Sequence, residues 1–155
     1  MSPMRVLVLI DGEGVAEQLI PSALKACRAT GRQLLILSVC QAEGFFVWEF
    51  PNLVLMRKEA AECADKWLRA CLELIPDDVG AEGRICVNRP GVALSQTLRT
   101  WGPDLVVMSQ PRKTIWHRWH TRWMVWLCAR RHVPIEVVGQ PVAESGLIHG
   151  NYVHA

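Results

Sequence analysis

The sequence lacks the features of secreted, disulfide-linked and membrane-spanning proteins. Its six cysteines are dispersed with no Cys-x-x-Cys pair, and we expect no secretory leader. No apolar run approaches the roughly 18 residues that a membrane span needs. This pattern predicts a cytoplasmic protein with reduced thiols and no transmembrane segment. The net charge of +2 is too small to indicate a polyanionic partner by itself.

Two further absences are local. No glycine occurs from Ser109 to Arg122, and no acidic residue occurs between Asp104 and Glu136. Glycines let consecutive backbone amides surround a phosphate, so a conventional phosphate-binding loop is not expected in the first stretch. The second stretch contains arginines and a lysine, which give it a strongly positive local charge.

The composition and the pattern of apolar runs indicate one globular α/β domain. Half of the 155 residues are hydrophobic and about a fifth are charged, which suits a chain with a sizeable core. Short apolar runs alternate with stretches of helical periodicity. We expect strands at 5–10, 33–40, 84–88, 105–108 and 134–138, and helices at 15–30, 60–75, 91–101 and 116–132. This alternation predicts a five-stranded parallel sheet with helices on both faces and ligands beyond the carboxyl ends of the strands.

Two segments stand outside this alternation. Residues 41–55 are expected to form an irregular loop, whose aromatic part from Phe45 to Pro51 would close a pocket or a subunit interface. Residues 1–139 would form the domain, and 140–155 a C-terminal tail or dimer arm.

Several motifs, in order, resemble the universal stress protein family from Val6 to Val138. They are the first strand closing on Asp11-Gly12, the helix end at 29–34, Asn88-Arg89-Pro90-Gly91, the stretch 102–108 and the stretch 132–138. The resemblance implies a Rossmann-like, adenine nucleotide alpha hydrolase-like fold. It also implies a cytoplasmic stress-response or regulatory protein, commonly a homodimer paired through the last strand, here through Ile135 and Val137.

The sequence departs from the family at the phosphate-binding motif. Nucleotide-binding members have Gly-x-x-Gly after the fourth strand and Gly-Ser or Gly-Thr about nine residues later. Here Pro111 removes an amide donor, and Thr121-Arg122 stands where the Gly-Ser pair is expected. We therefore predict a protein that does not bind ATP, acts through contacts with an unknown protein partner, and is a regulator rather than an enzyme.

A nucleotide-binding switch with a degenerate phosphate loop is the alternative. ATP or AMP would then be held without the glycines, with cationic side chains replacing amides. The candidate residues are Asp11, Gly12, Val39, Arg89, Ser109, Arg112, Lys113 and Thr121.

A tryptophan stripe marks the last predicted helix. Trp116, Trp119, Trp123 and Trp126 are spaced by three, four and three residues, and Arg122 lies among them. Such spacing favours core packing against the sheet. A homo-oligomer contact, an interfacial membrane helix and a platform for single-stranded nucleic acid remain as alternatives. Insertion into a membrane would compete with folding if the stripe faces the sheet.

No catalytic or metal site is predicted. Asp11 and Glu43 both approach the expected ligand edge, but nothing fixes their separation. His117 and His120 lie one turn apart, and packing or surface roles are favoured over a metal site, because structural zinc would need two more ligands.

Overall fold

The computed structural model describes residues 5–28, 33–41, 53–110 and 115–139. A single parallel sheet of five strands runs in the order β3-β2-β1-β4-β5. The strands are β1 (Arg5–Ile10), β2 (Gln33–Cys40), β3 (Ala81–Val87), β4 (Leu105–Ser109) and β5 (Ile135–Val138). The helices are α1 (Ala16–Arg28), α2 (Leu53–Glu73), α3 (Pro90–Thr100) and α4 (Ile115–Arg130).

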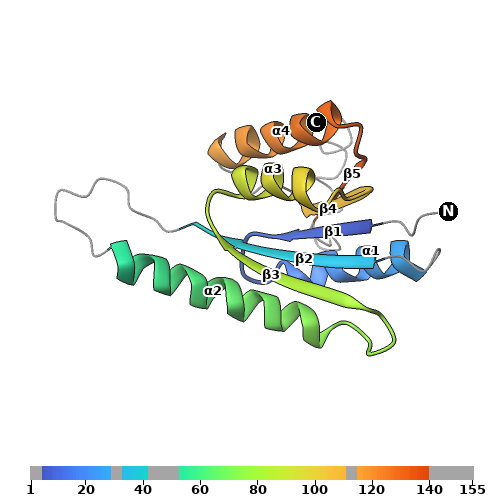
Figure 1. Ribbon diagram of the computed structural model, residues 1–155, viewed down its shortest axis with the longest axis horizontal. Coiled ribbons are helices and arrows are strands. Elements are labelled where there is room, and N and C mark those ends of the chain that lie inside the picture. The colour runs from blue at the N-terminus through green and yellow to red at the C-terminus, as the bar shows by residue number, and fades with distance from the viewer. Residues whose placement is uncertain (1–4, 29–32, 42–52, 111–114, 140–155) are drawn as a thin grey trace, which may run out of the picture.

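The helices cover both faces of the sheet, as the sequence predicts. Figure 1 shows α1 and α2 on one face and α3 and α4 on the other. Within the described residues no helix combines the length and the apolar character needed to cross a bilayer.

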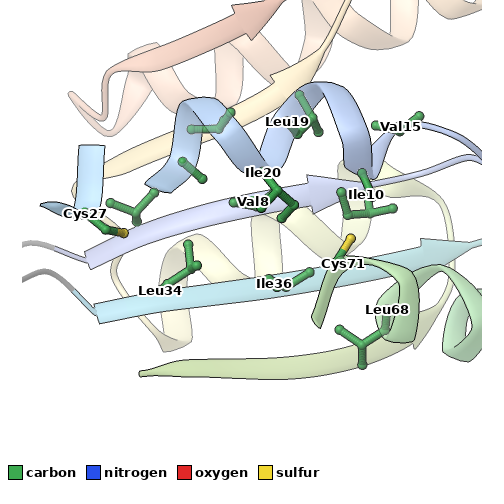
Figure 2. Close-up of a cluster of buried hydrophobic side chains, with 14 residues drawn as sticks. Val8, Ile10, Val15, Leu19, Ile20, Cys27, Leu34, Ile36, Leu68 and Cys71 are labelled. Atoms are coloured by element: carbon green, nitrogen blue, oxygen red, sulfur yellow. The ribbon is translucent and has the colours of Figure 1, made fainter. Parts of the chain in front are cut away.

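The two central strands explain the layered core. All residues from Val6 to Ile10 and from Leu34 to Val39 are buried, because helices pack on both faces of these strands. Alternate side chains of β1 therefore enter opposite layers: Val8 packs with residues of α1 and α2 (Figure 2), and Leu7 with residues of α3 and α4.

Most predicted bounds lie within about two residues of the observed ones, but two predicted starts are wrong by more than that. Helix α2 begins at Leu53 rather than at Ala60, so the end of the predicted loop is helical. Residues 55–59 of this helix are mostly exposed, and the stretch before Ala60 lacks the apolar periodicity on which the prediction relied. Strand β3 begins at Ala81 rather than at Arg84, because Ala81 already pairs with Leu34. The aromatic segment from Phe45 to Pro51 lies outside the described residues.

Hydrogen bonds attach the elements to one another at two points. The buried Ser38 hydroxyl on β2 donates to the Ala64 carbonyl of α2 at 2.7 Å. At the start of the sheet, the Arg5 amide donates to the Asp104 carboxylate and the Asp104 amide donates to the Arg5 carbonyl, both at 2.8 Å. The second pair joins β1 to the entry of β4.

Candidate functional site

The strand order creates a topological switch point at the carboxyl edge of the sheet. From β1 the chain builds outward through β2 and β3 on one side, while β4 and β5 lie on the other. The switch point is therefore between β1 and β4, where open α/β sheets bind ligands. Asp11 follows β1 and Ser109 ends β4, and both side chains are half-buried there.

Two other predicted site residues border the same edge. Gly12 follows Asp11 and is buried, and Val39 on β2 is buried in the layer formed with α3 and α4. The structure thus brings the carboxyl ends of three adjacent strands, β2, β1 and β4, to one edge with four of the predicted residues on them.

The predicted cationic residues are less well placed around this switch point. Arg89 is exposed and caps α3 directly after β3, with β2 and β1 between its strand and β4. Strands lie about 4.8 Å apart, so the ends of β3 and β4 are separated by roughly 14 Å. Thr121 lies half-buried on α4. Arg112 and Lys113 fall outside the described residues.

The start of the connection after β4 is tied to β5. The Gln110 amide, the first after β4, donates to the Val138 carbonyl at 2.9 Å. The Gln110 side chain also packs over Gly139, since a Cβ atom at Gly139 would lie 2.7 Å from Gln110 Oε1. This amide is therefore engaged within the sheet rather than directed at a ligand.

A side-chain clamp covers the N-terminus of α3. The Gly91 amide donates to His120 Nε2 at 3.0 Å, and the Trp123 ring lies so close that a Cβ atom at Gly91 would overlap it. The two α4 side chains contact each other edge to face, with ring centroids 5.5 Å apart. The Gly91 amide, the first amide of α3 that could meet an anion at this helix end, is thus bonded to a side chain and covered by a ring.

The sequence analysis did not find this clamp. The available signal was the spacing of His120 and Trp123, which places both on one side of a helix, together with a glycine that opens another helix. His120 therefore has the packing role that was favoured for it. No cluster of three or more metal-ligating side chains occurs in the described part of the chain, and the His117 side chain lies outside it.

Comparison with known proteins places the chain in a family. The model described as "Universal stress protein family" matches residues 3–119. The chain belongs to the universal stress protein family. Its fold is the Rossmann-like, adenine nucleotide alpha hydrolase-like one that the resemblance implied.

Solved universal stress proteins share this fold at low sequence identity. UspA from Lactobacillus plantarum is 15% identical with a TM-score of 0.69, over 87% of this chain and 97% of its own. A universal stress protein from Archaeoglobus fulgidus in complex with dAMP is 14% identical with a TM-score of 0.53, over 89% and 99%. One from Arabidopsis thaliana with AMP bound is 14% identical with a TM-score of 0.53, over 96% and 99%. No curated protein matches the sequence.

The tryptophan stripe of this universal stress protein does not face the sheet, so the favoured interpretation of core packing is wrong. Trp119, Trp123 and Trp126 are 66%, 38% and 52% exposed. The sheet side of α4 instead carries the buried residues Met124 and Cys128. The spacing placed the indoles on one side of the helix correctly, but two smaller apolar residues define the other side. The Trp116 side chain lies outside the described residues.

The last strand forms an edge of the sheet with which no other described strand pairs. β5 pairs with β4 on one side and is the end strand of the five. Ile135 is half-buried and Val137 is 38% exposed. An exposed edge with apolar side chains is suited to strand addition.

Proposed function

We propose that this universal stress protein is a homodimeric regulator in a stress response, which acts through protein contacts and does not bind ATP in the family's usual way. The observation that carries the proposal is the glycine-free connection after β4. Without glycine, successive amides are not readily turned toward a common phosphate.

The surrounding contacts support the same conclusion. The first amide after β4 is bonded to β5, and the first amide of α3 is bonded to His120. Neither amide can bind a triphosphate while it keeps this bond, and Arg89 is exposed at the end of β3, with β2 and β1 between that strand and β4. These contacts favour a carboxyl edge whose conformation does not depend on a bound nucleotide.

The nucleotide switch is a second candidate because Asp11 and Ser109 lie at the switch point between β1 and β4. Two relatives with the same fold carry dAMP and AMP. Under this alternative Asp11, Gly12, Val39, Arg89, Ser109, Arg112, Lys113 and Thr121 would hold an adenine nucleotide, without a complete phosphate loop.

Calorimetric titration of the full chain with ATP and AMP separates the two candidates. We expect no saturable heat with either nucleotide. Saturable binding of ATP that is lost in Asp11→Ala would refute the non-binding proposal and support the switch.

The proposed dimer forms through β5, with Ile135 and Val137 in the contact. Pairing of β5 with its counterpart would extend the sheet across both subunits and cover the open edge. Residues 140–155 follow this strand directly and would form the predicted tail or dimer arm next to it.

A matched pair of variants tests the dimer. Val137 on β5 and Ile85 on β3 are β-branched residues on the two end strands, exposed to 38% and 41%. We expect Val137→Lys to convert the dimer to a monomer in sedimentation velocity experiments, and Ile85→Lys to leave it intact. A monomeric parent chain, or a dimer that dissociates only in Ile85→Lys, would refute pairing through β5.

A further inference from the structure

An exposed aromatic and cationic face runs along α4. Trp119, Arg122, Trp123, Trp126 and Arg130 follow the i, i+3, i+4, i+7 and i+11 positions of one side of this helix, and all are exposed. We call these five residues the α4 outer face. The sequence between Asp104 and Glu136 contains six lysines and arginines and no acidic residue. The face therefore combines apolar area with unopposed positive charge.

The outer face is independent of the domain core. Met124 and Cys128 anchor the opposite side of α4 in the core layer, and α4 lies outermost with α3 in Figure 1. Trp119 and Trp126 can therefore be buried against a partner or a lipid surface while α4 stays packed on the sheet. The expectation that membrane contact would compete with folding does not apply to this arrangement.

The ring faces argue against a platform for stacked bases. The Arg130 guanidinium lies over the Trp126 ring at 5.3 Å from its centroid, and Trp123 packs on Gly91 and meets His120 edge to face. Base stacking needs free ring faces in succession. Two of the three described indoles have a face already covered, so they offer no continuous stacking surface. A lipid interface, by contrast, requires only that part of each ring leave water.

The charge argues against a second copy of this chain on the same face. An isologous contact would bring Arg122 and Arg130 of both subunits together with no acid on α4 to neutralise them. An anionic surface neutralises this charge and accepts indoles at its headgroup level.

We propose that the α4 outer face binds the surface of an anionic lipid bilayer. Trp119 and Trp126 enter the interfacial region, and Arg122, with Arg118 beside it, lies near the lipid phosphates. The helix lies along the membrane and does not span it. Because this contact uses neither β5 nor the carboxyl edge of the sheet, it is independent of the proposed function.

Vesicle flotation of the full chain tests the proposal. One set of vesicles contains phosphatidylcholine alone, and the other contains about one third phosphatidylglycerol. We expect the protein to float with the anionic vesicles and to remain in solution with the neutral ones, and salt to weaken the binding. Equal flotation with both sets, or with neither, would overturn the proposal.

Variants of the outer face locate the contact. We expect Trp119→Ala combined with Trp126→Ala to lower partitioning at least tenfold, and Arg122→Gln to lower it about fivefold. Leu72→Ala and Arg57→Gln on α2 are exposed controls and should leave partitioning unchanged. If the double tryptophan variant unfolds, Arg118→Gln with Arg122→Gln replaces it, because neither exposed arginine fills the core.

Two measurements distinguish other occupants. Binding of a single-stranded oligonucleotide that depends on Trp119 and Trp126, without vesicle binding, would overturn the proposal and assign the face to nucleic acid. Loss of a dimer in the double tryptophan variant would overturn it in favour of a contact between copies of this chain.

Discussion

At the scale of single residues, Gly91 illustrates how a missing side chain positions two helices. The space above its Cα is filled by the Trp123 ring, and its amide is bonded to His120. Both contacts join the start of α3 to α4. Glycine is needed here for the close approach of a ring.

Replacement of Gly91 tests this packing. Alanine at an ordinary helical position would stabilise the helix, but at Gly91 its methyl group would overlap the Trp123 ring. We expect Gly91→Ala to lower the free energy of unfolding by about 1–3 kcal/mol, measured in urea.

Gly80→Ala is the matched control, because no atom lies within 4 Å of the position its Cβ atom would take. Its stability should stay within about 0.5 kcal/mol of the parent. Combining Gly91→Ala with Trp123→Ala should cost less than the sum of the two single changes. Additive costs would show that the ring does not lie over Gly91.

At the scale of elements, the central strands were predictable and the edges were not. The continuous apolar runs of β1 and β2 predict their bounds directly, because both faces of these strands are buried. β3 is largely exposed, so its first residues carry no apolar signal. The beginning of α2 was missed for another reason, because its residues 53–56 form a continuous apolar run without helical spacing.

Helical periodicity alone also did not predict which side of α4 faces the sheet. The tryptophans follow helical spacing, and so do the buried residues Met124 and Cys128. The larger size of the tryptophans favoured their side of the helix as the buried one, which is wrong. The switch point between β1 and β4 followed from strand alternation, whereas the His120 contact to Gly91 depends on how two helices pack. The spacing of His120 and Trp123 places both on one side of a helix, but it does not identify the helix that they contact.

The bond from Ser38 to Ala64 fixes one such packing arrangement, that of α2 on β2. The hydroxyl is buried and donates at 2.7 Å. We expect Ser38→Ala to lower the free energy of unfolding by about 1 kcal/mol, measured by urea denaturation. Thr100→Ala is the control, because the exposed Thr100 hydroxyl bonds only within α3, to the Gln96 carbonyl. A cost for Thr100→Ala as large as that for Ser38→Ala would contradict a specific role of the α2 contact.

At the scale of the whole molecule, buried thiols make the free energy of unfolding depend on pH in the alkaline range. Burial raises the pKa of Cys71 and of Cys128 to about 11. In the unfolded chain a thiol ionises near pH 8.5. Between these values the unfolded state loses protons that the folded state keeps, so the free energy of unfolding falls as the pH rises.

This linkage predicts a measurable slope. Above about pH 9 each of the two thiols should lower the free energy of unfolding by up to about 1.4 kcal/mol per pH unit, and the loss should level off near pH 11. Urea denaturation at a series of alkaline pH values measures the slope. A variant with Cys71→Ala and Cys128→Ala should be less stable at neutral pH but should show a shallower decline. Parallel declines in both proteins would assign the effect to other groups.

The central place of β1 also affects how the domain is assembled. β1 finds its second neighbour only in β4, and the bonds between Arg5 and Asp104 join residues 99 positions apart. During synthesis, the first three strands emerge long before that neighbour. Until then β1, which is apolar from Val6 to Ile10, has one unpaired side, where mispairing with another nascent chain competes with completion of the fold.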